Sequence, residues 1–302
     1  MAKKKTKEKA ADNKKKSPVK EIKKTYSKFK KLTRWAYIIA AVFGLSFGGS
    51  FLRNPNSGLS TFSYELYDIV YEIFSDFDNL EYGIPGKQDS IINREGYAIG
   101  YSNKYKQPLW VCYNLTEDEV KKKKSSRSDD FRSDWRLWGK SAQLEDYKGS
   151  NYDRGHLAPA ADMHWSNKTM SQSFFMSNMS PQDPSFNRGA WMKLEEKVRD
   201  LAVKYKKIHV ISGPVFERSQ YKRIGKNRVA VPHGYYKVLY APEQNKMIGF
   251  ILPNEDASVN FKKYAVSVYD VEDAVQLEFL MNIAPDVRKK LKHEIDEDFW
   301  DL

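Results

Sequence analysis

The segment Asn151–Met163 limits the structure of this chain more than any other stretch. It places an acid, a guanidinium and an imidazole within four residues, Asp153-Arg154-Gly155-His156. We expect Gly155 to let the backbone turn so that both neighbouring side chains face one point, and Pro159 prevents a regular helix across the segment. A guanidinium and an imidazole together suit a phosphate, because one binds its oxygens and the other moves a proton. On these residues alone, a salt-bridged loop explains the segment equally well.

The net positive charge of the chain comes from its first 34 residues. The formal net charge is +12. Residues 1–34 hold 15 basic and 3 acidic side chains, which accounts for the whole of it, and the remaining 268 residues carry 36 of each sign. The main body is therefore neutral, and its bulk charge gives no argument for a nucleic-acid partner.

An apolar run separates this basic tail from the body. Residues 35–52 are eighteen consecutive uncharged residues between Arg34 and Arg53; as a helix they would span about 27 Å, enough for a bilayer core. We predict a transmembrane anchor that contacts the lipid bilayer, with a cleaved signal peptide or a buried core helix as alternatives. By the positive-inside rule, residues 1–34 form a cytoplasmic tail.

The segment 53–82 carries apolar residues at helical spacing and is predicted to be a juxtamembrane stalk or a first helix packed on the domain. The main domain is expected at 83–302, after the break at Gly83–Gly86. The expected location is thus a single-pass membrane protein, with its domain in the periplasm or exterior, or in an organelle intermembrane space.

Short strands outnumber helices in the main body. Cys112 is the only cysteine, so no intrachain disulfide and no cysteine-based zinc site is available, and the core must hold the fold. The class predicted is α+β with a mixed β-sheet core. Strands are expected at 97–102, 108–115 (a hairpin with the first), 174–178, 208–212, 228–231, 235–240 and 246–252, and helices at 187–206, 271–280 and from 285 onward.

Polar side chains that suit phosphodiester hydrolysis follow one another within about forty-five residues. His156 can be the general base, because an imidazole titrates near neutrality. Asn187 can give a hard cation such as Mg²⁺ an oxygen ligand, with Glu195 fixing its water shell, and Arg154 can bind the phosphate. Purely structural roles also fit these residues: Asn178 as a turn residue, Asn187 as a helix cap and Glu195 in a surface ion pair.

Three motifs together resemble a known family. Asp153-Arg154-Gly155-His156 with the following Leu-Ala-Pro-Ala is similar to the signature of the DNA/RNA non-specific endonucleases, ββα-metal nucleases that include the endonuclease G group. The stretches Ser177–Gln182 and Phe186–Glu195 match the next two motifs of that family in order and approximate spacing. The resemblance covers roughly residues 85–285.

The resemblance implies a role for each of these residues. His156 corresponds to the general base, Asn187 to the direct ligand of a single Mg²⁺ (with Mn²⁺ as a substitute) and Glu195 to the carboxylate that orients metal-bound water. Asn178 corresponds to a residue that sets hydrogen bonds in the site, and Arg154 to a phosphate contact. An upstream arginine is expected to stabilise the transition state; Arg127 is our candidate, with Arg132 as the alternative.

The implied activity is a metal-dependent endonuclease that cuts DNA and RNA with little sequence preference and leaves 5′-phosphate and 3′-hydroxyl ends. A homodimer is left open. Two other functions fit the same residues: a membrane-tethered, non-catalytic nucleic-acid-binding module, and a phosphodiesterase for smaller phosphoesters. The intact set His156, Asn187 and Glu195 favours the enzyme over the binding module.

Overall fold

A computed structural model describes residues 77–86, 88–216 and 221–302. The predicted tail, the predicted transmembrane anchor and residues 53–76 lie outside these ranges. None of the helices within them is long and apolar enough to cross a membrane.

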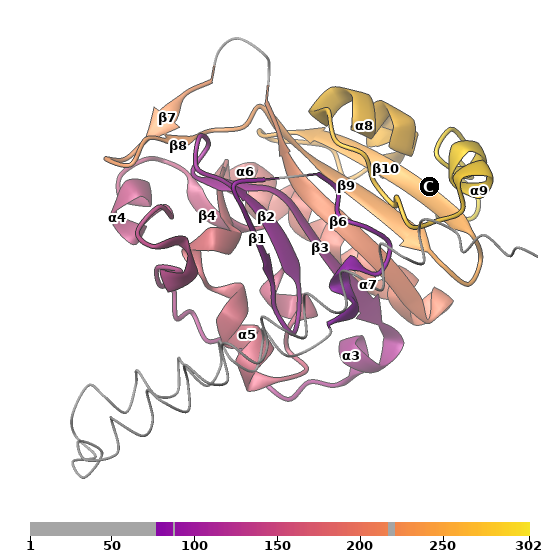
Figure 1. Cartoon of the computed structure of the whole chain (residues 1–302), viewed down its shortest axis with the longest axis horizontal. Helices are drawn as coiled ribbons and strands as arrows, with labels where there is room; N and C mark the ends of the chain where they lie inside the picture. Colours follow the sequence, from indigo (N-terminus) through magenta and orange to yellow (C-terminus); the bar gives the residue numbers. More distant parts are fainter. Residues whose placement is uncertain (1–76, 87, 217–220) are drawn as a thin grey trace, which may run out of the picture. The chain divides into compact units, whose positions relative to one another are not determined.

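The described residues form an α+β fold around one large sheet, which confirms the predicted class (Figure 1). Every pair of neighbouring strands in this sheet is antiparallel, so the predicted mixed sheet is wrong. Short turns join β1 to β2, β2 to β3 and β9 to β10, and strands joined by such turns can pair only antiparallel. The order of its seven strands among the described residues is β1 (Ser90–Asn93), β2 (Ala98–Ser102), β3 (Gln107–Thr116), β6 (Lys207–Val215), β9 (Gly234–Ala241), β10 (Lys246–Pro253) and β11 (Ala265–Val266).

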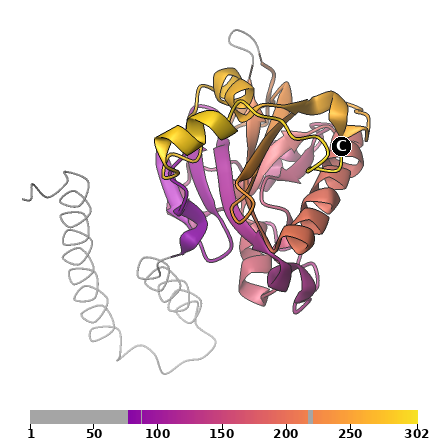
Figure 2. The same ribbon diagram turned by 90° about the vertical axis from the view of Figure 1, so that its right-hand side faces the viewer.

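Helices cover both faces of the sheet (Figures 1 and 2). Helix α7 (Met192–Tyr205) buries Leu194, Val198 and Leu201 in the larger core on one face. Helices α8 (Val268–Val275) and α9 (Pro285–Leu291) contribute to a second core on the opposite face. Apolar residues three or four apart give each helix one buried side, which is why it packs on a sheet face.

A long excursion between β3 and β6 carries most of the residues singled out in the sequence. It contains two short strands, β4 (Asp153–His156) and β5 (Met179–Gln182), which pair with each other, followed by α7. Its other helices are α3 (Glu117–Lys121), α4 (Leu144–Tyr147), α5 (Asn167–Ser173) and α6 (Pro184–Phe186). After β6, two further short strands, β7 (Arg223–Ile224) and β8 (Val229–Ala230), pair with each other.

The helix expected at 271–280 is α8, which already ends at Val275. Two predicted elements of the long excursion also differ from the observed ones. The strand expected at 174–178 is wrong: Met176–Asn178 is a 3-10 helix, and the strand β5 begins only at Met179. The helix expected at 187–206 begins as a regular α-helix only at Met192. In both places a side-chain amide, of Asn178 or Asn187, bonds to a distant part of the chain, which local periodicity does not report.

Candidate active site

Strand β4 places Arg154 and His156 on one side, because residues two apart on a strand point the same way. Both side chains contact the ring of Phe131: the Arg154 guanidinium carbon lies 4.1 Å from its centre, and the centre of the His156 ring lies 5.7 Å from it. The glycine between them makes no turn. A Cβ on Gly155 would lie 2.0 Å from Oε1 of the buried Gln182, so this position needs glycine for close packing.

His156 forms a cluster with two aromatic rings, which also contact each other with centres 4.9 Å apart. The rings of Phe174 and Phe131 meet it edge-on, with centres 4.8 and 5.7 Å away. Its Nε2 is shielded from solvent and has no hydrogen-bond partner among the described residues. Burial, with the charges of Arg127 and Arg154, lowers the pKa of His156 to about 3. The imidazole is therefore neutral at physiological pH, which is the form in which a ring nitrogen keeps the lone pair that a base needs.

Asn187 precedes helix α7 and does not cap it. The short helix α6 before it is capped by Asp183, and Asn187 opens a π-helical turn, Asn187–Trp191, with a kink at Gly189. Such turns interrupt a regular helix and often occur at functional sites. The Nδ2 of Asn187 donates to Oδ2 of Asp153 at 2.9 Å. This bond orients the amide and leaves its oxygen as the atom available to a cation.

Asp153 connects the π-helical turn to strand β4. Besides Asn187, it accepts two hydrogen bonds from Arg188, 2.9 Å from Nε and 2.7 Å from Nη2. Burial by itself would raise the pKa of Asp153, but the bonds from Arg188 and Asn187 outweigh it and lower that pKa. The sequence did not reveal this pairing, since the partners lie far apart in the chain.

Glu195 lies on the first turn of α7 and is only partly exposed. Its carboxylate has no hydrogen bond or ion pair among the described residues. Burial raises its pKa, and the attraction of Lys237, ahead of Arg199 and Arg127, opposes that shift. The surface ion pair that could have explained this residue is not formed in the described ranges, so the carboxylate remains available to water or a cation.

Asn178 is fully buried and bonded through its whole side chain. Its Nδ2 donates to the carbonyls of Ala158 and Ser173 at 2.9 and 2.8 Å, and its Oδ1 accepts from the amide of Ala158 at 2.9 Å. These bonds hold the chain just after His156. Asn178 therefore positions the segment and presents no free atom to a substrate.

The two upstream arginines differ in their surroundings. Arg127 is about half exposed (54%), pairs with Asp129 and holds its guanidinium 4.9 Å from the Phe174 ring centre. It lies near enough to His156 and Glu195 to lower the pKa of each. Arg132 instead bonds to Asp130 and the carbonyl of Ser171 and stacks on Phe175. Arg127 is thus the arginine whose charge reaches both site residues.

The donor set fits a hydrated hard cation. No group of three or more His, Cys, Asp and Glu side chains able to hold a metal occurs in the described part of the chain. The Asn187 oxygen and the Glu195 carboxylate are the available oxygen donors, and Mg²⁺ needs only one or two protein ligands because it retains its waters.

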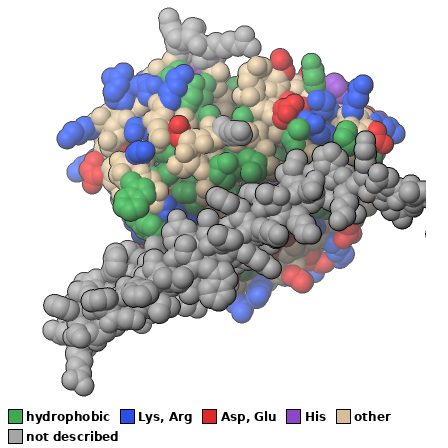
Figure 3. Space-filling view, viewed as in Figure 1, with side chains coloured by type: hydrophobic (Ala, Val, Ile, Leu, Met, Phe, Trp, Pro, Cys, Tyr) green, Lys and Arg blue, Asp and Glu red, His purple; other side chains and the backbone are tan. Residues whose placement is uncertain are grey.

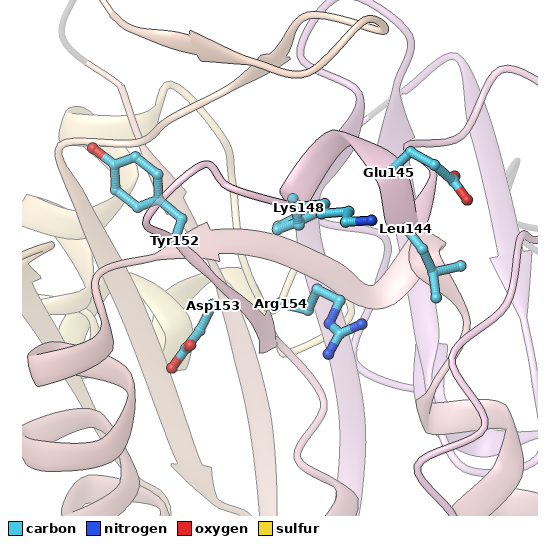
Figure 4. A pocket seen from close by; sticks show the side chains of 7 residues that line it. Leu144, Glu145, Lys148, Tyr152, Asp153 and Arg154 are labelled. Atoms are coloured by element: carbon cyan, nitrogen blue, oxygen red, sulfur yellow. The ribbon is translucent and has the colours of Figure 1, made fainter.

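A pocket of about 430 Å³ adjoins strand β4 (Figure 4). In the close view, Tyr152 lies on one side and Leu144 and Glu145 on the other, with Asp153 and Arg154 below and between them. Its lining residues are Leu144, Glu145, Tyr147, Lys148, Tyr152, Asp153 and Arg154. It combines aromatic and cationic groups beside the residue expected to bind phosphate.

Comparison with known proteins shows the family of this chain. The family model described as DNA/RNA non-specific endonuclease matches residues 75–286. This chain belongs to that family. Human mitochondrial endonuclease G is 35% identical over 218 residues, 67% of this chain and 73% of that protein. A mitochondrial nuclease of Saccharomyces cerevisiae is 30% identical over 268 residues, 81% of this chain and 79% of that protein.

A solved structure of an endonuclease G is also similar to this chain. It is the crystal structure of an EndoG/EndoGI complex, described as the mechanism of EndoG inhibition. The TM-score is 0.63 at 32% identity, over 68% of this chain and 91% of that chain. The predicted family, its α+β fold and the enzyme class, a DNA/RNA non-specific endonuclease, are confirmed.

These relatives also correct the location expected from the sequence. We expected a single-pass membrane protein with its domain beyond the membrane. The human and yeast relatives carry names that place them in mitochondria. The expected membrane location is therefore wrong and is not retained.

Sequence reasoning missed Lys237, a fully buried lysine near Glu195. A signal for it was present: it is the single charge in the apolar run Tyr235-Tyr236-Lys237-Val238-Leu239-Tyr240. A charge inside a strand that reads as buried on both faces marks a position of special chemistry.

Proposed function

We propose that this protein hydrolyses phosphodiester bonds in DNA and RNA, with His156 as the general base and a Mg²⁺ ion held at Asn187. One observation carries the proposal. A neutral imidazole and an exposed guanidinium share one side of β4, while Asp153 of the same strand orients the Asn187 amide. Base, phosphate contact and metal ligand thus belong to one rigid unit.

Each residue has a task in this reaction. Bound Mg²⁺, or Mn²⁺ in its place, would offset negative charge on the phosphate. Asn187 would bind it through Oδ1, and the Glu195 carboxylate would accept hydrogen bonds from its waters. His156 takes a proton from the attacking water, and Arg154 binds the non-bridging oxygens. Arg127 offsets charge that develops in the transition state.

The substrate class follows from this chemistry. Because water is the nucleophile, the ribose 2′-hydroxyl is not needed, so both DNA and RNA can be cut. Lys and Arg side chains gather over β7 and β8 (Figure 3), and Lys222 lies 5.1 Å from the ring of Tyr152 in the pocket beside β4. Contacts of such cations to phosphates carry no sequence information, which favours non-specific cutting.

Cleavage by the purified full chain tests the proposal. Plasmid DNA and a long RNA are incubated with Mg²⁺, with Mn²⁺ and with a chelator. We expect cutting only with metal. His156→Ala should remove cutting while the melting temperature stays nearly unchanged. His209→Ala is the control, since His209 is a buried histidine that bonds to Asn114 in the main sheet; it should lower stability and leave cutting in place at a permissive temperature.

The alternatives have distinct outcomes. Folded wild-type protein that binds DNA but leaves it intact in Mg²⁺ would refute the enzyme and support a binding module. Cutting of a dinucleotide diester at a higher rate than long DNA would indicate a phosphodiesterase for small substrates. Normal cutting by His156→Ala would remove His156 from the role of base.

A further inference from the structure

Lys237 is a charged residue in the middle of the main core. It lies on β9, and its register partners are Ser212 on β6 and Phe250 on β10, all three fully buried. The residues two places away on β9, Tyr235 and Leu239, belong to the core beneath α7. Residues two apart share a face, so Lys237 also points toward α7. A buried ammonium costs several kcal/mol unless a charge or hydrogen bond compensates it.

The ammonium of Lys237 reaches the start of α7. Its Nζ lies 4.3 Å from the centre of the Trp191 ring, shielded from solvent and without a hydrogen-bond partner among the described residues. Trp191 has helical backbone angles and precedes Glu195 by four residues. Residues four apart lie on the same side of a helix. The ammonium therefore lies beside the helical turn that carries Glu195.

The other charges nearby already have partners. Arg199 bonds to Oδ1 of Asp162 at 2.8 Å, and Tyr113 donates to Oδ2 of the same carboxylate at 2.7 Å. Asp162 is thereby satisfied at both oxygens. Lys237 and Glu195 remain as the cation and the anion of this region without a bonded partner in the described ranges.

Electrostatics agree with this pairing. Burial raises the pKa of Glu195 and lowers that of Lys237. Among the charges that oppose these shifts, Lys237 is the strongest for Glu195, and Glu195 is the strongest for Lys237. Burial is the larger influence on both groups and shifts each pKa toward the uncharged form, and each group is the largest influence that opposes this shift in the other.

We propose that Lys237 is a positioning residue that acts through Glu195: its buried ammonium attracts the carboxylate and sets its place beside the water shell of the metal. This inference rests on the proposed function, in which Glu195 orients that water. Glu195 lies on the first turn of α7 and Lys237 on the neighbouring sheet strand, so the ammonium acts on the carboxylate from the sheet side. A neutral side chain at 237 would leave the carboxylate without its nearest compensating charge.

A double-mutant cycle tests the inference in the full chain. Lys237→Met keeps the length of the stem and removes the charge. It is made alone and together with Glu195→Gln, and Mn²⁺ affinity is measured by electron paramagnetic resonance beside kcat and KM on DNA. Residues that orient metal ligands typically contribute 10- to 100-fold, so we expect Lys237→Met to weaken Mn²⁺ binding and lower kcat by about 10-fold or more, with little change in KM.

The cycle separates a role through Glu195 from a merely structural one. In the Glu195→Gln background, Lys237→Met should have no further effect on either quantity. The double variant should melt at the same temperature as Glu195→Gln or higher. In Glu195→Gln the buried Lys237 charge has lost its partner, and Lys237→Met removes that charge. Lys246→Met is the matched control: it removes a half-exposed lysine of the neighbouring strand that pairs with Asp296, and it should alter neither Mn²⁺ binding nor kcat.

Each other outcome decides the question. Equal effects of Lys237→Met in both backgrounds, unchanged Mn²⁺ affinity and kcat, or tighter Mn²⁺ binding would overturn the inference; the last would mean that Lys237 acts on the cation directly. If Lys237→Met fails to fold, Lys237→Gln replaces it in the same cycle. If the cycle shows coupling in Mn²⁺ binding but the wild-type protein cuts no DNA or RNA, the proposed function alone is refuted. If the wild-type protein cuts but the cycle shows no coupling, this inference alone is refuted.

Discussion

Asn178→Ala should be one of the most destabilising single substitutions near the site. The side chain makes three hydrogen bonds, to the carbonyl and amide of Ala158 and to the carbonyl of Ser173, all in fully buried surroundings. Each bond contributes about 1 kcal/mol, and buried groups left unpaired add a further penalty, so the loss should be about 3–5 kcal/mol. That is a large part of the roughly 5–15 kcal/mol by which a native protein is stable.

Urea unfolding at fixed pH measures this loss. With a slope of about 3 kcal/mol per molar for a domain of this size, a loss of about 4 kcal/mol moves the midpoint down by about 1.3 M. Asn254→Ala is the matched control: Asn254 also makes three side-chain hydrogen bonds, but in partly exposed surroundings. Water can replace part of them, so its loss should be about 1–2 kcal/mol. Equal losses for the two variants, or a loss below about 1 kcal/mol at Asn178, would refute the reasoning.

Three further predictions concern strand β4, which carries the proposed base, and the arginines around it. Gly155→Ala should destabilise the protein by about 1–3 kcal/mol and reduce cutting, because the new Cβ would overlap the buried Gln182 side chain; a wild-type melting curve would contradict this. Arg127→Ala should lower kcat by about 10-fold or more at unchanged melting temperature. Arg132→Ala should instead lower the melting temperature, since Arg132 bonds to two parts of the chain. The reverse pattern would exchange the roles of the two arginines. Arg154→Ala should raise the pKa of His156 from about 3 toward its ordinary value, because a nearby cation disfavours the imidazolium; an unchanged titration of the His156 ring proton signal in nuclear magnetic resonance would rule out this influence.

Local sequence patterns predicted the sheet core well. Alternating and apolar runs located the β2–β3 hairpin and the central strands β6, β9 and β10 within a few residues. They gave the direction of the β2–β3 hairpin but not that of strands joined by longer connections, which depends on how those connections return to the sheet. They also misread Phe174–Asn178 as a strand, because the apolar residues there are buried by a turn that the Asn178 amide holds in place.

The candidate site shows the same division. Residue types, spacing and the family resemblance predicted roles for His156, Asn187 and Glu195, and in the structure a kinked turn at Gly189 separates Asn187 from the helix of Glu195. The pairing of Asp153 with Asn187 and Arg188 was not accessible, since it joins positions more than thirty residues apart.

For this protein, the sequence by itself determined the chemical groups and the family, because the three motifs lie in short contiguous stretches whose side chains must act near one another. Only the tertiary structure decided which side chains are free and which are engaged. Burial and long-range contacts make His156 neutral, engage both polar atoms of the Asn178 side chain and bring Lys237 of β9 beside the turn of α7 that carries Glu195. These properties depend on the distance of each group from water and from other charges, and those distances exist only after the strands and helices have packed.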